Sequence, residues 1–416
     1  MPDSKLVIEG GTKLRQKPWP SRSLLGEEEK AAVNALFDSS LESGNAFGYN
    51  GEVEEAYCKE FAEYLGGGYA DAVNSGTSAV FVALRALDLP MYSEVIVGAV
   101  TDPGGMMPIP MMGCIPVPAD IAPNSYSTGP EQVEQAITAQ TSAILVSHIG
   151  GEPADIEGIL EVANKHGIPV VEDCAQAPGA LVNGRLVGTF GITAAFSTMN
   201  GKHFCTGGQG GVGFTKDAEL YKKIRWASDR GKAFGLPAGS KNKIASLNFN
   251  LGDLGAAIGR EQLKKLPGIV ERRRGVVAKL RAATEGLKSV SVPVLAPGVE
   301  ASYWFLRMNF DPTAVTCDRS VFMQALEAEG LPMLADYVLI NPHTFDWFTE
   351  KRVFGTPGFP WTSPEYKGDP NRVYPCPNIE KTHATSFRLS IHESWGDEEV
   401  ADAVAIFSKV ETAFKK

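Results

Sequence analysis

The stretch Asn200–Gly211, NGKHFCTGGQGG, places an amine, an imidazole and a thiol in one glycine-rich segment, at Lys202, His203 and Cys205. Such a segment can cradle a phosphate, ligate a metal or present a reactive amine. Each of these functions requires a different set of neighbouring residues, so the sequence around the stretch can discriminate between them.

Two phosphate-binding motifs do not fit. A P-loop needs a glycine where Phe196 stands and Ser or Thr where His203 stands. Gly208, Gly210 and Gly213 match GxGxxG, but VGFT, a predicted strand, follows where a dinucleotide site needs a helix. Nor do His203 and Cys205, without a second ligand pair, form a closed metal site. We therefore predict that no metal is bound here. We expect His203 and Cys205 to have packing or loop roles.

A lysine that carries pyridoxal phosphate (PLP) fits better, because this cofactor also needs an acid at its ring nitrogen and a cup for its phosphate. Asp173 follows the predicted strand IPVVE, and Asn74–Ala79, NSGTSA, is typical of a strand-to-helix turn. Alone, each feature has an ordinary explanation as a helix cap, a turn or a solvated lysine. Their combination predicts Lys202 and Asp173 as catalytic residues in a PLP pocket.

The elements around these residues indicate an α/β fold. From Tyr69 onward, short apolar runs such as EVIVGAV and TSAILVSHI alternate with helical periodicity, which predicts a doubly wound sheet with its site at the carboxyl ends of the strands. Residues 27–66 are predicted to be mostly helical. Residues 253–285 are predicted to form a long helix interrupted at Pro267-Gly268. We place a large domain at 1–265 and a small α+β domain at 266–416.

The composition argues against some classes of function. The chain has 416 residues with 44% hydrophobic and 21% charged, and its net charge of -10 argues against a nucleic-acid partner. Its start lacks a signal segment and it has no long apolar run, so we expect no membrane partner. The six scattered cysteines are typical of reduced thiols. We therefore expect a cytoplasmic protein.

The chain resembles the DegT/DnrJ/EryC1/StrS family of PLP-dependent sugar and cyclitol aminotransferases over nearly its whole length. The motifs that carry the resemblance are IEGGTKLRQKPWP, NSGTSA, HIGGEPADI, EDCAQAPGA, the Lys202 segment and LNFNLGDLGAAIGREQL. The resemblance implies fold type I of the aspartate aminotransferase superfamily. That fold has a large domain with a mostly parallel, seven-stranded-type sheet flanked by helices, a small α+β carboxyl-terminal domain, and a homodimer with shared active sites.

The resemblance also implies roles for individual residues. Lys202 corresponds to the Schiff-base lysine, Asp173 to the acid at the pyridine nitrogen, and Gln176 to the residue near the phenolic oxygen. The residues implied for the phosphate are Gly76, Thr77, Ser197 and, from the partner subunit, Asn248.

The activity implied is transfer of an amino group from glutamate or glutamine to a keto cyclitol or a keto sugar, with or without a nucleotide, through pyridoxamine phosphate. Two alternatives remain open: a PLP-dependent sugar dehydratase or deoxygenase of the same family, and a PLP-binding regulatory protein without turnover. Some relatives that dehydrate have histidine at the lysine position, so Lys202 favours the aminotransferase.

The chain departs from the family where an aromatic residue usually stacks on the cofactor ring, since Asp102 stands there. We expect Asp102, His148 and Tyr337 to be candidate substrate residues, with Tyr303 and Trp304 as further aromatic candidates. For Arg388 and His392 a structural role is favoured. The Arg272–Arg274 run is expected to form a solvated helix face.

Overall fold

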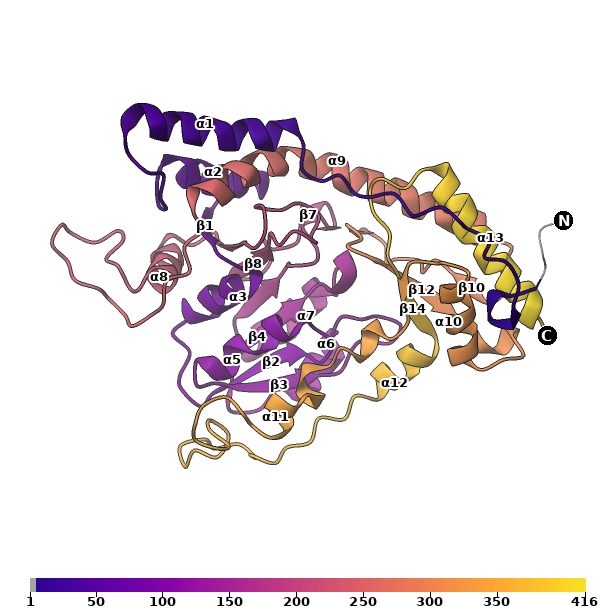
Figure 1. Cartoon of the computed structure of the whole chain (residues 1–416). Coiled ribbons are helices and arrows are strands. Elements are labelled where there is room, and N and C mark those ends of the chain that lie inside the picture. The colour runs from indigo at the N-terminus through magenta and orange to yellow at the C-terminus, as the bar shows by residue number, and fades with distance from the viewer. Residues whose placement is uncertain (1–4) are drawn as a thin grey trace.

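The structure, a computed structural model, describes residues 5–416 and has a seven-stranded sheet at the centre of its larger domain (Figure 1). The strand order is β1-β9-β8-β5-β4-β2-β3. Only β9 runs antiparallel to its neighbours, so the sheet is mostly parallel, as predicted. The strands are β1 (Tyr69–Val73), β2 (Glu94–Gly98), β3 (Ile115–Ala119), β4 (Thr141–Ser147), β5 (Val170–Asp173), β8 (Thr193–Ser197) and β9 (Gly211–Thr215).

Helices cover both faces of this sheet, which explains why its inner strands are continuous apolar runs. Ile96 of β2 packs in a cluster with residues of α2 (Glu52–Tyr64), α6 (Pro130–Ala136) and α7 (Ile156–His166). Its neighbours Val95 and Val97 pack on the opposite face with α3 (Gly76–Arg85), α5 (Pro108–Met111) and α8 (Ala218–Ser228). Short connections include α4 (Pro103–Met106) and a small sheet of β6 (Leu181–Val182), β7 (Arg185–Leu186) and β11 (Val299–Glu300).

The smaller domain is an antiparallel sheet covered by two helices. Its strand order is β10-β12-β14-β13, and α10 and α13 share a hydrophobic cluster with it. The elements are β10 (Val290–Ser291), β12 (Leu306–Phe310), α10 (Arg319–Ala328), β13 (Met333–Leu334), α12 (Pro377–Ala384), β14 (Ser386–Leu389) and α13 (Asp397–Phe414). The α+β prediction for this part of the chain is therefore confirmed.

One helix, α9 (Asp253–Thr284), runs across both domains (Figure 1). The predicted interruption at Pro267-Gly268 is wrong, because the helix continues through Pro267. Leu263, Leu266, Ile269 and Val270 are buried around this proline, and their packing outweighs the roughly 3 kcal/mol that an interior proline costs a helix. The boundary that we placed between residues 265 and 266 falls inside α9.

The amino-terminal segment follows the small domain although it precedes α1 (Glu27–Ser43) in the chain (Figure 1). Leu6 is buried in the small-domain cluster, Arg15 pairs with Glu399, and Trp19 stacks on Trp395 with ring centroids 4.6 Å apart. Residues 5–20 thus lie with the carboxyl-terminal domain.

A long excursion, residues 342–376 with α11 (Asp346–Thr349), leaves the small domain and returns to it after packing on the large one. Phe348, Trp361 and Tyr366 are buried against the large-domain sheet cluster, and Tyr366 donates its hydroxyl to Glu94 at 2.6 Å. Within residues 5–416, no helix combines the length and apolar character that a membrane span needs.

Candidate active site

A pocket of about 210 Å³ opens where the carboxyl ends of β5 and β8 meet the turn after β1. This is the edge of the sheet where open α/β folds place their ligands. Its lining includes most of the residues that the sequence singled out: Gly76, Thr77, Asp102, Asp173, Gln176, Ser197 and Lys202. Ser75, Val80, Gly104, Gly105, Ala175, Met199 and Gln209 complete it.

Lys202 lies in the loop between β8 and β9, and its side chain is buried in the pocket. A backbone hydrogen bond from Lys202 to Met199 closes a turn that directs the side chain inward. Burial lowers the pKa of the amine to about 8, although the negative charges of Asp173 and Asp102 oppose this shift. At this pKa roughly a tenth of the Lys202 amine is neutral and nucleophilic at pH 7, far more than for a solvated lysine.

Asp173 ends β5 and is buried beside Lys202. Its Oδ1 accepts the backbone N–H of Ala175 at 3.0 Å, and its Oδ2 accepts the hydroxyl of Ser147 at 3.2 Å. Burial raises the pKa of this carboxyl, while these hydrogen bonds and the charge of Lys202 act in the opposite direction. A cationic ring placed against Asp173 would favour the ionised carboxylate.

The turn from β1 into α3 packs tightly against Ser197. The hydroxyl of Ser75 caps α3 by accepting the N–H of Ser78 at 3.0 Å. A Cβ on Gly76 would lie 2.7 Å from the Cβ of Ser197, so only glycine fits there. Gly76 and Ser197 are thus in close contact, and together with Thr77 they line the pocket at the amino terminus of α3, a position suited to a phosphate.

Gln176 and Tyr337 form a hydrogen-bonded pair at the side of the pocket. The Gln176 Oε1 accepts the N–H of Gly150 at 2.7 Å, and its Nε2 donates to the Tyr337 hydroxyl at 3.1 Å. Tyr337 is buried, and burial raises the pKa of its phenol, which stays protonated. Tyr337 contacts the candidate cofactor residue Gln176 and is not part of the pocket lining itself.

Asp102 occupies the place expected for a stacking aromatic. Its Oδ1 caps the short helix α4 by accepting the N–H of Gly104 at 2.8 Å. A Cβ on Gly104 would lie 2.3 Å from Thr77 Oγ1, and one on Gly105 would lie 3.1 Å from Asp173 Oδ2. The backbone of α4 therefore closes this wall, and Asp102 adds a carboxylate to the pocket.

Two residues of the small domain approach Lys202 without lining the pocket. Lys202 Nζ lies 3.7 Å from the ring centroid of Trp304, whose indole donates to the Gly201 carbonyl at 2.8 Å. The Arg388 guanidinium lies 4.8 to 5.4 Å from the rings of Trp304, Phe305 and Tyr337.

Arg388 is notable because it has no ion-pair partner among residues 5–416, and its Nε is buried without a hydrogen bond. Burial lowers its pKa, and the neighbouring charge of Arg388 in turn lowers that of Lys202. The sequence favoured a structural role for Arg388; its only hint was a cationic residue in an otherwise apolar strand, SFRLSI.

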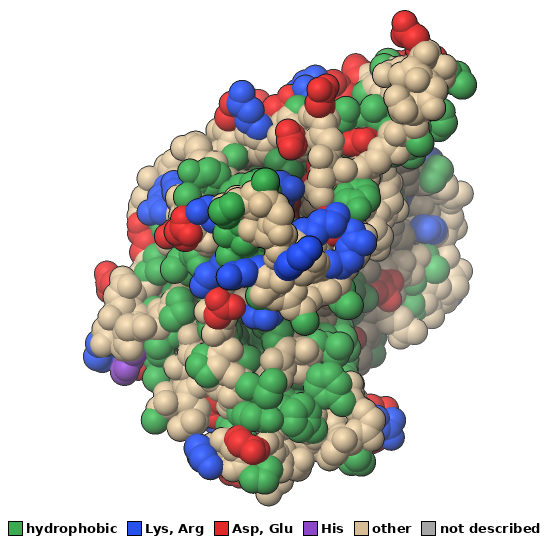
Figure 2. Space-filling model, turned by 90° about the vertical axis from the view of Figure 1, so that its left-hand side faces the viewer, with side chains coloured by type: hydrophobic (Ala, Val, Ile, Leu, Met, Phe, Trp, Pro, Cys, Tyr) green, Lys and Arg blue, Asp and Glu red, His purple; other side chains and the backbone are tan. Residues whose placement is uncertain are grey.

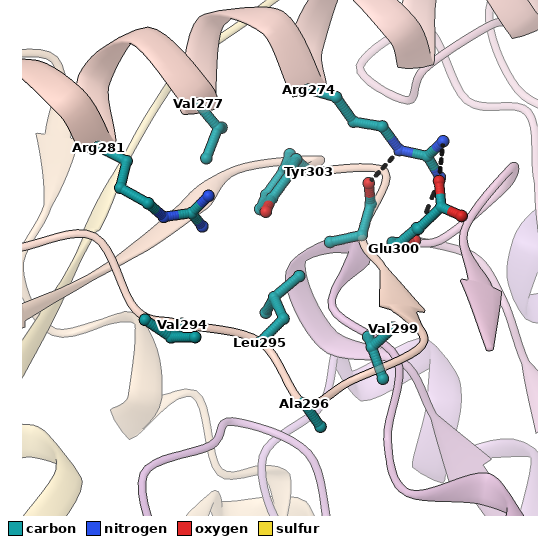
Figure 3. A pocket seen from close by; sticks show the side chains of 10 residues that line it. Arg274, Val277, Arg281, Val294, Leu295, Ala296, Val299, Glu300 and Tyr303 are labelled. Atoms are coloured by element: carbon teal, nitrogen blue, oxygen red, sulfur yellow. Dashed lines mark hydrogen bonds and ion pairs between the residues drawn. The ribbon is translucent and has the colours of Figure 1, made fainter. Parts of the chain in front are cut away.

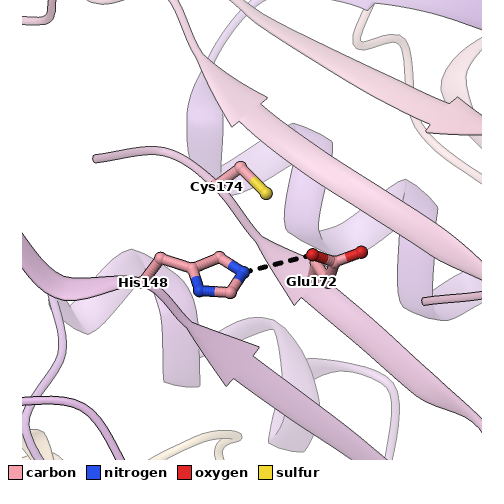
Figure 4. Close-up of side chains that lie close together, drawn as sticks. All are labelled: His148, Glu172 and Cys174. Carbon is pink, nitrogen blue, oxygen red and sulfur yellow. Dashed lines mark hydrogen bonds and ion pairs between the residues drawn. The ribbon is translucent and has the colours of Figure 1, made fainter. Parts of the chain in front are cut away.

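His148, a candidate substrate residue, lies in the interior and outside the pocket lining (Figure 4). Its Nδ1 accepts the N–H of Ala154 at 3.1 Å, so Nε2 carries the proton and donates to Glu172 at 3.2 Å. Both Glu172 oxygens are also occupied by the N–H groups of Gly188, Phe190 and Gly191. Cys174 completes this cluster as a buried thiol whose pKa is raised by burial.

Tyr303 and the arginine run also differ from expectation. Tyr303 is not among the residues that line the Lys202 pocket and instead lines a second hollow with Val277 and Arg281 (Figure 3). The predicted solvated face at Arg272–Arg274 is wrong for its middle residue, since Arg273 is fully buried and pairs with Glu393. His392 is half-buried, stacks edge-on against Trp395 and lies outside the pocket lining.

Asn248 lies outside the pocket of its own chain and is exposed. Its Oδ1 accepts the N–H and the side-chain amide of Asn250 at 3.1 and 2.8 Å, which holds it at the start of the crossing into α9. The contact of Asn248 with the phosphate site of a partner subunit stays a prediction.

Comparisons with known proteins agree on the family. The chain is 31% identical to "L-glutamine:2-deoxy-scyllo-inosose aminotransferase" of Micromonospora echinospora, covering 97% of both chains. It is 33% identical to "dTDP-3-amino-3,4,6-trideoxy-alpha-D-glucose transaminase" of Streptomyces venezuelae, over 75% of this chain and 79% of that one. A solved aminotransferase from Psychrobacter cryohalolentis superposes with a TM-score of 0.81 at 26% identity, covering 96% and 99% of the two chains.

The superposition confirms the predicted type I fold, with its mostly parallel sheet and smaller second domain. The profile of the DegT/DnrJ/EryC1/StrS aminotransferase family matches residues 25–407. The protein thus belongs to this family and is an aminotransferase.

Proposed function

We propose that the protein transfers an amino group from glutamate or glutamine to a keto sugar or keto cyclitol, with PLP attached to Lys202. The observation that carries this proposal is that Lys202, Asp173 and the closely packed pair Gly76 and Ser197 all line one pocket. The similarity to an inosose aminotransferase and to a sugar transaminase supports both acceptor classes.

The described residues fit the cofactor. Asp173 would face the ring nitrogen, Gln176 the ring oxygen, and the α3 amino terminus with Thr77 and Ser197 the phosphate. When bound, PLP supplies an aldehyde that takes the donor's amino group and a ring that stabilises negative charge at the donor's α-carbon. The volume and the donor groups of the pocket match a group of this kind.

The chain's own residues then have defined tasks. Lys202 binds the cofactor through Nζ and, once released, moves a proton at the donor's α-carbon, as its lowered pKa allows. Asp173, held by Ala175 and Ser147, keeps a proton on the ring nitrogen. Trp304 covers Lys202 and limits the access of water.

Arg388 is proposed to bind the carboxylate of the amino acid donor. Its guanidinium lacks an anionic partner within the described chain, lies among aromatic rings and is near enough to Lys202 for its charge to lower the pKa of that amine. A carboxylate in that position would gain a charge-assisted, bidentate contact in a partly desolvated site. Asp102 and Tyr337 are proposed to contact the polar acceptor, because the carboxylate of Asp102 accepts only one bond in the structure.

A homodimer with shared sites is also proposed. The loop at 229–247, which leads to Asn248, stands out from one face and carries the exposed Arg230, Lys232, Lys241 and Lys243 (Figure 2). Hydrophobic side chains gather below it on the same face (Figure 2). An exposed apolar patch with polar and charged residues at its rim is typical of a protein interface.

A donor screen followed by an acceptor screen tests the proposal. Protein loaded with PLP is expected to be yellow, to bleach with glutamate or glutamine, and to regain its colour with a keto cyclitol or keto sugar. Lys202→Ala serves as the control that binds the cofactor without the covalent link. If no amino donor bleaches the loaded protein, the regulatory alternative replaces the proposal; if dehydrated sugar forms without amination, the dehydratase replaces it.

A further inference from the structure

A buried charge triad, Arg22–Glu393–Arg273, lies behind the pocket and joins three distant parts of the chain. Glu393 Oε1 accepts from Arg22 Nε at 2.9 Å, and Oε2 accepts from Arg273 Nε at 2.8 Å. The side chains of Arg273 and Glu393 are 2% and 5% exposed, and that of Arg22 is 19% exposed. Arg22 comes from the segment after PWP, Arg273 from α9 and Glu393 from the loop after β14.

The remaining donors of Arg22 hold the loop that carries Lys202. Its two terminal nitrogens donate to the carbonyls of Lys202 and His203 at 2.5 and 2.8 Å. A planar guanidinium can bind two successive carbonyls and a carboxylate at once, whereas an ammonium cannot reproduce this geometry.

Arg273 holds the neighbouring segment in the same way. One of its terminal nitrogens donates to the carbonyls of Tyr303 and Trp304 at 2.7 and 3.1 Å. The two held segments also bind each other, since the ring of His203 is 3.0 Å from the Ser302 carbonyl and the indole of Trp304 donates to Gly201. The triad therefore holds the backbone of two residues, Lys202 and Trp304, whose side chains lie against each other.

Removing three charged side chains from water costs free energy, so the partners of each charge show how the protein tolerates the triad. Each arginine has Glu393 as a counter-ion and donates further hydrogen bonds to two peptide carbonyls, which is the condition under which buried charges are tolerated. The charges of Arg273 and Arg22 hold the pKa of Glu393 below its usual range despite burial, so the carboxylate stays ionised. Arg273, Glu393 and Arg22 thus form one stable unit.

We propose that Glu393, acting through Arg22 and Arg273, is a positioning residue that sets the Lys202 amine and the Trp304 ring at the reacting centre. The inference rests on the proposed role of Lys202 and adds to it the residues that aim the amine. Arg22, Arg273 and Glu393 themselves do not line the pocket and are not expected to touch substrate.

The test compares Arg22→Lys and Arg273→Lys with Arg272→Gln in PLP-loaded protein. The lysine variants keep the charge and lose the double carbonyl contact, whereas Arg272 is an exposed neighbour on α9 and serves as the control. Each protein is measured for kcat, for KM of the donor, for Tm, and for the pH midpoint of the cofactor's absorbance. The rate at which apoprotein captures PLP on Lys202 is a further measure that does not depend on turnover.

Both lysine variants are expected to lose about ten- to a hundredfold in kcat, because small misplacements of a reacting group cost rates of this size. KM of the donor should change less than about threefold, while PLP capture slows and the pH midpoint shifts. Arg272→Gln should match the wild type. Wild-type protein that captures no PLP would contradict the proposed function instead, so the two failures are distinguishable.

Two results would overturn the positioning role. In the first, Arg22→Lys and Arg273→Lys match the wild type in kcat, capture rate and pH midpoint. In the second, Tm and cofactor content fall but kcat per bound cofactor and the pH midpoint stay constant, which would mean that the triad serves stability alone. Glu393→Gln, which leaves two buried arginines without a counter-ion, should show the same kinetic defect with a clear loss of Tm.

Discussion

Trp304 lies against the amine of Lys202, with Nζ 3.7 Å from its ring centroid, and its indole N–H is bonded to Gly201, the residue before the lysine. The same side chain therefore contacts the reactive group and its backbone. This double contact joins the small domain to the catalytic loop of the large domain.

Trp304→Phe should separate the two contacts, since it keeps a ring over Lys202 and removes the bond to Gly201. A lost neutral hydrogen bond costs about 1 kcal/mol, so kcat should fall about fivefold. Trp304→Ala removes both contacts and should lower kcat further. Steady-state kinetics with matched cofactor content checks this order, and equal kcat values for the two variants would contradict it.

The reactivity of Lys202 in the apoprotein should follow its lowered pKa. Because burial favours the neutral amine, modification by an amine reagent should be half-maximal near pH 8. Asp173→Asn removes a charge that stabilises the ammonium, so its midpoint should move to lower pH. Peptide mass spectrometry after pulsed labelling measures both. Lys232, whose pKa is raised by its bond to Asp229, is the internal control and should react only at higher pH.

The close approach of Gly76 to Ser197 predicts a rescue. Gly76→Ala should weaken PLP binding strongly, because its Cβ would lie 2.7 Å from that of Ser197. Adding Ser197→Gly removes the atom that clashes and should recover part of the affinity, although the serine hydroxyl is lost. Equilibrium titration with PLP gives the comparison. A double variant that binds no better than Gly76→Ala would show that helix geometry, and not the clash, sets the effect.

His148→Ala should act on stability. It leaves the Ala154 N–H and one side of Glu172 without a partner in the interior, which costs about 2 to 4 kcal/mol. We expect Tm to fall by several degrees in thermal denaturation, with KM for the acceptor unchanged. A raised acceptor KM with an unchanged Tm would instead support the substrate role that the sequence suggested.

Arg388→Gln should weaken the amino acid donor selectively. Losing a charge-assisted contact costs about 1.5 to 3 kcal/mol, so KM of glutamate or glutamine should rise about ten- to a hundredfold. The reaction of protein preloaded with pyridoxamine phosphate and an acceptor should keep its rate, because no donor is present. Stopped-flow absorbance separates the two half-reactions, and equal losses in both would contradict a donor-specific role.

The sequence predicted those parts of the site that depend on residues close together in the chain. Asp173 follows a buried parallel strand and Gly76 opens a capped helix, so their place at one sheet edge follows from the α/β rhythm alone. The role of Lys202 in its glycine-rich loop could be predicted only after Asp173 and Gly76 had been placed at that edge of the sheet. The same rhythm predicted the sheet and its helices, and a change of pattern after the long helix, to the runs SYWFLRMNF and SFRLSIH, predicted the small α+β domain.

The remaining features depend on contacts between residues far apart in the chain. Arg273 was expected in solvent because its neighbours are arginines, but its partner Glu393 lies 120 residues away. Pro267 was expected to interrupt α9, and the packing of both domains keeps the helix intact. His148 ends a strand where ligands often bind, yet it faces Glu172 inside the protein. Neither propensity nor spacing contains this information.

The position of the amino-terminal segment has a consequence for synthesis of the protein on the ribosome. Arg15 is made 384 residues before its partner Glu399, and Trp19 is likewise made long before Trp395. Arg22 likewise waits for Glu393 before it can hold the Lys202 loop. The large-domain sheet can form before this point, but a nascent chain should acquire its catalytic geometry only after Glu393 has been translated.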